Sequence, residues 1–162
     1  MDIKDIDLNN VSVSADIIRL DNVNVQNSNL ECNQNSTRLA CMVHNTTVSN
    51  SKIISYMRDM QSDGGKAFYA ITSSFFNGTT IEGYYDSEPS GIGVYLEGDF
   101  DMDDTVTIIG QASGSDSVGI SLSSGTVNGI SVTPENITGV FDNNFKGSGV
   151  CKIMMDNTCV SK

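Results

Sequence analysis

The sequence predicts an all-β fold, a parallel β-helix of about six irregular rungs, from three observations. In the second half of the chain an aliphatic-x-Gly signal recurs, and nine or ten residues after each Gly a second Gly opens a short apolar stretch. In the first half, aliphatic residues recur two positions before an Asn. The signals of the second half return at a nearly constant spacing, from Gly83 to Gly110 to Gly139. Such a repeat suits a β-solenoid, because each turn buries its apolar side only against its neighbours.

The first half of the chain is expected to contain three bends that end on Asn. Asn is the non-Gly residue that best tolerates the left-handed backbone region. The three bends are Leu8-Asn9-Asn10, Val25-Gln26-Asn27 and Val48-Ser49-Asn50. A strand with one face in the core is expected after each bend, because side chains two apart share a face. These strands are Ile18-x-Leu20, Leu39-x-Cys41-x-Val43 and Ala67-x-Tyr69-x-Ile71.

One short helix near 51–61 is expected to interrupt the rungs. Ile54, Met57 and Met60 lie close to a 3.6-residue period, and the sequence Asp63-Gly64 that follows would end a helix.

The second half is expected to contain three copies of one sequence module. Its first signals are Ile81-Glu82-Gly83, Ile108-Ile109-Gly110 and Ile137-Thr138-Gly139. Its second signals are Gly93-Val94-Tyr95-Leu96, Gly119-Ile120-Ser121-Leu122 and Gly149-Val150-Cys151-Lys152-Ile153. In each module we interpret the Gly as part of a bend between two strands.

Composition excludes several classes of partner. The net charge is −11 and there is no cluster of Lys and Arg, which argues against nucleic acid and against anionic lipid as partners. No apolar run approaches the roughly 20 residues of a membrane span, and the N-terminus does not open a signal peptide. We therefore expect a single β-helical segment, 1–162, of a longer secreted protein, with irregular rungs over 1–78 and regular rungs over 79–162.

The four cysteines form two local pairs by spacing, Cys32 with Cys41 and Cys151 with Cys159. Two disulfides that close short loops, and an oxidising compartment, are the favoured interpretation. Zinc binding is disfavoured, because neither spacing is Cys-x-x-Cys and His44 is the only histidine. Buried free thiols acting as small hydrophobic side chains remain an alternative.

The densest charge feature is the run from Asp99 to Asp104. On a strand, Asp99, Asp101 and Asp103 would share one face. Calcium binding is one interpretation, but the positions that an EF-hand loop fills with Gly and Glu hold Asp104 and Gly110. A solvated acidic patch that could meet a basic partner is favoured, and no metal or cofactor is expected.

Catalysis is not expected of this chain. Hydrolytic β-helices cut polysaccharides with paired carboxylates, and Asp86 with Glu88, or Glu97 with Asp99, are the available pairs. Acidic residues at bends are usually turn residues, however.

Aromatic residues cluster between residues 68 and 95, and they are the expected binding residues. Adjacent pairs cannot both face inward on a strand, so one member of each pair must meet solvent or an irregular loop. Exposed aromatic side chains concentrate binding energy. An alternative is that they fill a wide rung. The expected recognition surface spans 66–104, with Phe75, Phe76, Tyr84, Tyr85, Tyr95, Asp99, Asp101 and Asp103 as its contact residues.

Residues 108–129, IIGQASGSDSVGISLSSGTVNG, resemble the filamentous-haemagglutinin-type repeats of bacterial two-partner-secreted exoproteins. The resemblance covers 79–153. It implies a right-handed parallel β-helix, secreted through an outer-membrane transporter and exposed on the outer surface of the bacterium.

Within that family the chain is most similar to the receptor-binding region of a contact-dependent growth inhibition effector. The resemblance implies a module that binds an outer-membrane protein of a neighbouring bacterium and so allows toxin delivery. A host-cell adhesin fragment and an inert filament spacer are the alternatives. A polysaccharide-processing enzyme is a more distant one.

Overall fold

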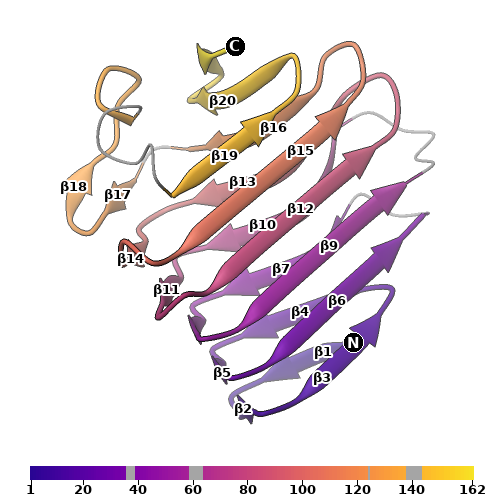
Figure 1. The fold of residues 1–162 in the computed structure, drawn as a ribbon, viewed down its shortest axis with the longest axis vertical. Helices are drawn as coiled ribbons and strands as arrows, with labels where there is room; N and C mark the ends of the chain where they lie inside the picture. The colour runs from indigo at the N-terminus through magenta and orange to yellow at the C-terminus, as the bar shows by residue number, and fades with distance from the viewer. Residues whose placement is uncertain (36–38, 59–63, 124, 138–143) are drawn as a thin grey trace.

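In the computed structural model the chain winds into an all-β solenoid built from three parallel sheets (Figure 1). The structure describes residues 1–35, 39–58, 64–123, 125–137 and 144–162. Sheet A has the order β1 (Asp2–Lys4), β4 (Ile18–Asp21), β7 (Leu39–His44), β10 (Gly65–Ile71), β13 (Gly91–Glu97), β16 (Val118–Leu122), β20 (Cys151–Met155), β21 (Thr158–Ser161). Sheet B has the order β14 (Asp101–Met102), β11 (Ser74–Phe76), β8 (Thr47–Ser49), β5 (Asn24–Gln26), β2 (Asp7–Asn9). Sheet C has the order β19 (Phe145–Ser148), β15 (Thr107–Ser113), β12 (Thr80–Asp86), β9 (Lys52–Arg58), β6 (Asn29–Gln34), β3 (Ser12–Ala15).

The solenoid has about four regular turns, fewer than the expected six rungs. From β1 to β12 each turn supplies a strand of at least three residues to all three sheets. In the next turn sheet B receives only the two-residue β14, and after it the chain forms a separate hairpin of β17 (Thr126–Val127) and β18 (Ile130–Ser131). The last strand, β21, pairs antiparallel with β20. Regular coiling therefore ends before the C-terminus.

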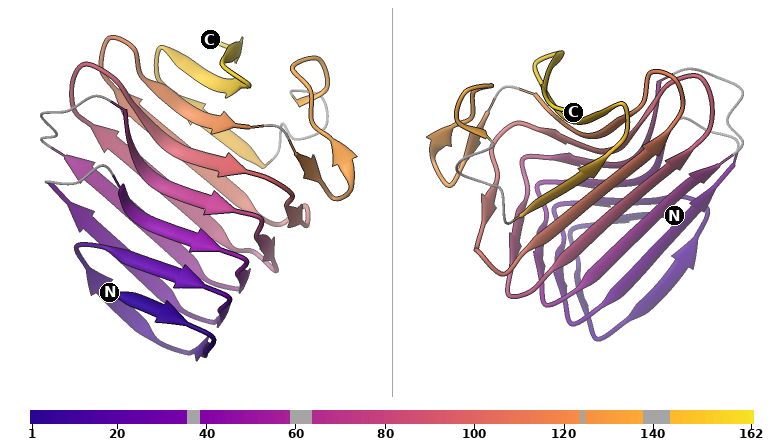
Figure 2. Two further views of the ribbon diagram at one scale, coloured as in Figure 1. Left: turned by 180° about the vertical axis from the view of Figure 1, so that it is seen from behind. Right: turned by 45° about the horizontal axis from the view of Figure 1, so that its top comes forward.

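The first turns of the solenoid are shorter than the later ones, and the molecule has the tapered outline of Figure 1. In sheet A, Ile3 of the first turn pairs with Leu20, whereas Leu122 of a late turn pairs with Met155, so the length of chain in one turn nearly doubles. Sheets A and C face each other, and the short sheet B closes one side between them (Figure 2). The interior between the sheets is a continuous apolar core.

One corner of the solenoid, between sheets B and C, uses the Asn bends expected from the sequence. The bend residues Asn10, Asn27 and Asn50 have φ of 57°, 49° and 45°. A side-chain ladder follows this corner, in which Asn50 Nδ2 donates to Asn27 Oδ1 at 2.8 Å and Asn27 Nδ2 donates to Asn9 Oδ1 at 3.1 Å. A second ladder, from Asn45 through Asn22 to Asp5, follows the corner between sheets A and B. Side-chain amides therefore hold successive turns in register.

Strand register confirms most of the expected repeats and corrects one. Leu8, Val25 and Val48 align across β2, β5 and β8, and Ile81 aligns with Ile108. The predicted position of the third module is wrong. Phe145-Lys146-Gly147 occupies the position expected for Ile137-Thr138-Gly139, and residues 138–143 lie outside the described residues. Correspondingly, Ile120 aligns with Ile153, three residues beyond the expected Val150.

The expected helix near 51–61 is also wrong over the residues that the structure describes. Lys52–Arg58 forms strand β9, which pairs with β6 and β12 along its length, while 59–61 lie outside the described residues. Ile53 and Met57 face the core, while Ile54 and Tyr56 are half-buried on the other face. Apolar residues on both faces blurred the strand period of two, so that every third residue could look helical.

The Gly of the Ile-x-Gly signal lies inside a strand and marks a close approach of sheets A and C, not a bend. A Cβ on Gly83 would lie 2.1 Å from the carbonyl oxygen of Gly93, and one on Gly110 would lie 2.1 Å from that of Gly119. One turn earlier, the aligned Ser55 donates its hydroxyl to the carbonyl oxygen of Ala67. Side chains larger than these would push the sheets apart.

The two predicted disulfides are confirmed. Cys32 of β6 bonds to Cys41 of β7 with 5.8 Å between Cα atoms, and Cys151 bonds to Cys159 with the same separation. Cys32 is aligned with Ser55 and Gly83, so the first disulfide joins sheets C and A along the line of close approach. Among the described residues no helix is long and apolar enough to cross a membrane.

Candidate functional site

The structure distributes the predicted contact residues over three faces of the solenoid. Phe75 and Tyr85 are buried in the core, and their neighbours Phe76 and Tyr84 are half-buried and point outward. The expectation that each aromatic pair would split is therefore confirmed. Phe76 lies on sheet B, Tyr84 on sheet C and Tyr95 on sheet A. Residues 66–104 thus wrap around the molecule and do not form one surface.

Two of the three predicted aspartates are structural. Asp99 Oδ1 accepts hydrogen bonds from the backbone N and the hydroxyl of Thr126, at 2.9 and 3.0 Å. Asp103 accepts from the backbone N of Asn77 at 2.7 Å and from Thr105, and these bonds lower the pKa of Asp103. Asp101 is exposed on β14. Phe100 and Met102 are buried between them, as the alternation predicts.

The carboxylates considered for catalysis also have hydrogen-bond partners. Asp86 Oδ1 accepts from Ser113 Oγ at 2.7 Å, Glu88 accepts from the backbone N of Ser115 at 3.0 Å, and Glu97 accepts from the hydroxyl of Tyr69. The described residues contain no group of three or more His, Cys, Asp or Glu that could hold a metal ion.

Tyr95 lies in a small aromatic group on sheet A. Its ring centroid is 5.2 Å from that of Tyr69, and the Lys66 ammonium lies 4.6 Å from the centroid of the Tyr95 ring and 5.1 Å from that of Tyr69. This group is one of two outward tyrosine pairs.

The other pair belongs to a larger surface, the outer face of sheet C. Strand register places outward side chains of neighbouring turns in rows across β6, β9, β12, β15 and β19. We call this surface face C. It consists of Glu31, Asn33, Lys52, Ile54, Tyr56, Arg58, Glu82, Tyr84, Asp86, Ile109, Gln111, Ser113, Lys146 and Ser148.

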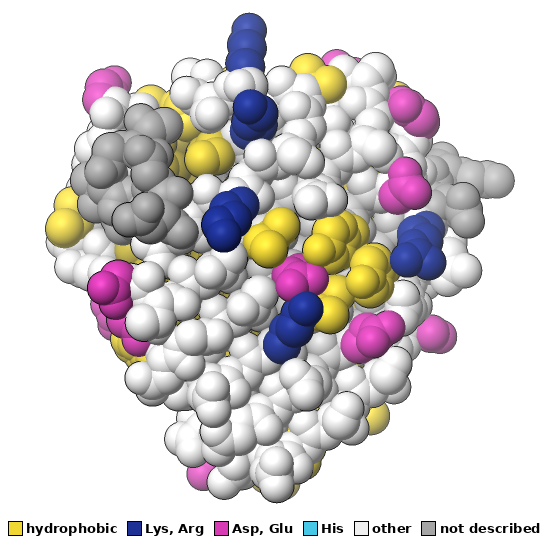
Figure 3. Space-filling view, viewed as in Figure 1, with side chains coloured by type: hydrophobic (Ala, Val, Ile, Leu, Met, Phe, Trp, Pro, Cys, Tyr) yellow, Lys and Arg dark blue, Asp and Glu magenta, His cyan; other side chains and the backbone are white. Residues whose placement is uncertain are grey.

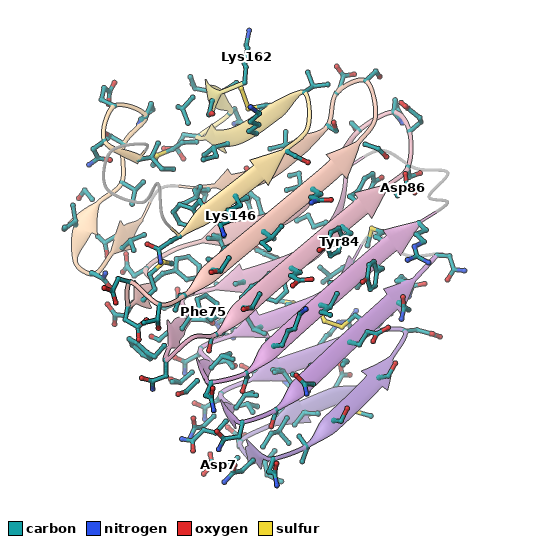
Figure 4. All side chains as sticks on the ribbon, in the orientation of Figure 1. Asp7, Phe75, Tyr84, Asp86, Lys146 and Lys162 are labelled. Atoms are coloured by element: carbon teal, nitrogen blue, oxygen red, sulfur yellow. A yellow bond between two sulfur atoms is a disulfide. The ribbon has the colours of Figure 1, made fainter. Side chains whose placement is uncertain are left out.

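Figure 3 shows the composition of face C: hydrophobic side chains gather at its middle, with Lys, Arg, Asp and Glu side chains among and around them. Tyr56 and Tyr84 are neighbours in the row Asn33, Tyr56, Tyr84, Gln111, Ser148, and their rings are stacked, with centroids 5.1 Å apart and 15° between ring planes. The Arg58 guanidinium lies 4.8 Å from the Tyr56 ring centroid. In Figure 4 the labelled Tyr84 and Asp86 lie on β12 and Lys146 on β19.

Polar contacts hold Tyr84 in place. Its hydroxyl donates to Glu82 Oε2 at 3.0 Å, and Lys52 Nζ lies 2.8 Å from Glu82 Oε1. Burial, followed by the hydrogen bond to Glu82, raises the pKa of Tyr84 to about 12. The hydrogen bond to Glu82 and the stack on Tyr56 hold the ring in place.

A hollow of about 400 Å³ opens beside the tyrosine stack. Tyr56, Arg58, Tyr84, Asp86, Gln111 and Ser113 contribute to its walls, with Ser148 at the far side. It lies toward the end of the strands, where the loops between sheets C and A begin.

Sequence reasoning found only Tyr84 among the residues at the centre of face C. It missed Ile54, Tyr56 and Ile109, because the helix expected near 51–61 placed the first two outside any sheet. A signal was present. The segments KIISYMR and TIEGYYD lie one turn apart and align residue by residue, with Tyr56 opposite Tyr84.

Comparison of the chain with protein-family models, with curated proteins and with solved structures found no match.

Proposed function

We propose that this chain is a non-enzymatic recognition module that binds its partner through face C. The observation that carries the proposal is the composition of that face. Ile54, Tyr56, Tyr84 and Ile109 form a half-buried apolar centre. Lys146 continues the row of Ile54 and Ile109, and Lys52 and Arg58 lie in the two flanking rows. Specific protein interfaces have an apolar, aromatic-rich centre and a polar rim, and Tyr and Arg are frequent among their strongest contacts.

The rigidity of the face supports the same function. Strands β9, β12 and β15 are each hydrogen-bonded to a neighbour on both sides, so the rows across them cannot shift relative to one another. The Tyr84 ring is further held by Glu82. A preformed surface loses little conformational entropy when it binds.

The proposed partner is an outer-membrane protein of a neighbouring bacterium. This choice rests on the resemblance of residues 108–129 to filamentous-haemagglutinin-type repeats, together with the solenoid fold. The proposal includes secretion through an outer-membrane transporter as part of a longer surface filament, and contact-dependent toxin delivery. It also includes right-handed coiling, the hand that parallel strand connections almost always adopt.

The test is binding of fluorescently labelled protein to intact Gram-negative cells, including a set of mutants that each lack one outer-membrane protein. We expect saturable binding that is lost in one of these mutants. Tyr84→Ala should weaken the binding at least tenfold, as expected for an aromatic anchor. Tyr95→Ala is the matched control, because Tyr95 is also a half-buried tyrosine in a ring pair, but on sheet A.

Other outcomes contradict defined parts of the proposal. Loss of binding with Tyr95→Ala alone would move the site to sheet A. Binding to host cells and not to bacteria would favour an adhesin. The absence of saturable binding to any cell would favour a filament spacer.

A further inference from the structure

The tyrosine stack on face C ends at Tyr84, and a hollow lined by Tyr84 and Gln111 lies at this end. The third row across the sheet reads Asn33, Tyr56, Tyr84, Gln111, Ser148. One face of the Tyr84 ring packs on Tyr56. The other face is turned toward the next turn, where the row continues with Gln111 and Ser148, which have no ring. The hollow of about 400 Å³ runs beside the stack, from Tyr56 and Arg58 past Tyr84 to Gln111 and Ser148.

Hydrogen-bonding groups surround this face of the Tyr84 ring. The Gln111 amide and the Ser148 hydroxyl lie in the same row, and the Arg58 guanidinium, the Asp86 carboxylate and the Ser113 hydroxyl line the adjacent edge. Ser113 donates to Asp86 Oδ1 at 2.7 Å, which orients the carboxylate. Each of the amide, guanidinium and carboxylate groups can contact two ligand atoms at once. The guanidinium donates hydrogen bonds, the carboxylate accepts them, and the amide does both.

We propose that this hollow binds a neutral sugar ring. A pyranose has an apolar face of C–H groups, which packs favourably on the electron-rich face of an aromatic ring. It also has a rim of hydroxyls, each of which needs both donors and acceptors. The face of Tyr84 toward Gln111 and the groups around it supply both requirements. The volume lies in the range of small-ligand pockets, roughly 300–1,000 Å³.

Other ligand classes fit the hollow less well. An anionic ligand would meet Asp86 as well as Arg58 in the hollow, so the local attraction is offset, and the chain as a whole has a net charge of −11. A wholly apolar ligand would remove water from the Gln111 amide and from the Asp86 carboxylate, which costs free energy for each group. A polyhydroxylated neutral ligand avoids both penalties.

The inference rests on the proposed function in one respect: the sugar site would be a second contact on face C, beside the contact with a protein. A bacterial surface presents glycans next to its proteins, so both contacts can form together. The two proposals remain separable, because the sugar can be supplied in solution without any cell.

The test uses purified protein and the methyl glycosides of glucose, galactose, mannose and N-acetylglucosamine. Binding is followed by saturation-transfer NMR on the sugar and by chemical shifts of ¹³C-labelled tyrosine rings. We expect at least one sugar to bind with a Kd of about 1 mM, typical of a ligand this small. The Tyr84 ring resonances should shift, while those of Tyr95 should not.

Two variants test the geometry. Gln111→Tyr extends the stack by one ring in register with Tyr84 and fills the place of the sugar, so binding should fall at least tenfold while the protein stays folded. Tyr84→Ala should have the same effect on the sugar, and Tyr95→Ala should leave sugar binding unchanged. Glucuronic acid should bind more weakly than glucose.

Absence of sugar binding up to about 50 mM, or binding that survives Gln111→Tyr, would overturn the inference. Cell binding that is lost with one outer-membrane protein and unaffected by free sugar would then leave the proposed function standing alone. Sugar binding without cell binding would support the sugar site and contradict the proposed function.

Discussion

Gly83 of β12 lies directly against the carbonyl oxygen of Gly93 in β13: a Cβ on Gly83 would stand 2.1 Å from that oxygen. The same contact recurs one turn later between Gly110 and Gly119. Sheets C and A therefore touch backbone to backbone along one line of the interior. Beyond this line the strands of sheet C continue to the end that carries Tyr84 and Asp86, so the close approach fixes where that part of face C lies.

Gly83→Ala should destabilise the protein strongly. The added methyl would meet a backbone oxygen that cannot rotate away, so the loss should lie at or above the upper end of the ~1–3 kcal/mol usual for overpacking. Gly78→Ala is the comparison, because a Cβ there meets nothing within 4 Å and the cost comes only from its φ of 73°, about 1 kcal/mol. Urea unfolding measures both. Equal losses would contradict the close approach as the reason for Gly83.

Both disulfides should be formed in the native protein and should stabilise it. Each closes a short loop, with sequence separations of 9 and 8 residues. Loop-closure entropy at this length predicts a loss of about 2–3 kcal/mol for Cys32→Ser combined with Cys41→Ser. The measurement is urea unfolding of this variant and of the wild type, with alkylation and mass spectrometry to count thiols. Four thiols alkylated in the unreduced native protein would refute the prediction.

The corner between sheets B and C could be predicted from the sequence because its chemistry is restrictive. A left-handed residue must be Gly or Asn with few exceptions, so Asn10, Asn27 and Asn50 marked one corner directly. The aliphatic residue two positions earlier then fixed the register of sheet B. The corner between sheets C and A left no such mark, because its loops differ in length and sequence from turn to turn.

Gly was the less reliable signal, since it served two purposes. In the Ile-x-Gly signal, Gly allows two sheets to touch, whereas at other positions it forms bends. Because every such Gly was interpreted as part of a bend, the third module was placed at Ile137 instead of Phe145. Face C was hidden for a related reason. Tyr56 and Tyr84 are one full turn of the solenoid apart in the sequence. The strand register makes them neighbours, and the local sequence of either segment does not reveal this.

Asn50→Ala should separate backbone conformation from side-chain bonding in the Asn ladder. Ala at a φ of 45° is strained by about 1–2 kcal/mol, and the bond to Asn27 is also lost. Asn50→Gly loses the same hydrogen bond but tolerates the backbone. We expect the order of stability wild type, then Gly, then Ala, measured by urea midpoint. Asn29→Ala, an exposed strand position, is the control and should change little. An Ala variant as stable as the Gly variant would contradict the conformational argument.

Tyr84 should make the stability of the protein depend on pH in the alkaline range. Burial and the bond to Glu82 raise its pKa from 10.0 to about 12. In the unfolded chain the phenol loses its proton near pH 10, whereas the folded protein keeps it, so unfolding is favoured above that pH. The stabilisation from this group is therefore fully present below pH 10 and is lost as the pH rises from 10 to 12.

Tyr84→Phe isolates this effect, because it keeps the ring but removes the ionisable hydroxyl. The difference in urea midpoint between wild type and variant should be constant below pH 10 and should shrink between pH 10 and 12. Absorbance titration should show that the variant lacks one of the tyrosines that ionise late. Tyr69 also has a raised pKa, from burial and its bond to Glu97, but it is present in both proteins and cancels in the comparison. A midpoint difference that stays constant across this range would show that the pKa of Tyr84 is not raised, and would contradict both the burial of its hydroxyl and its hydrogen bond to Glu82.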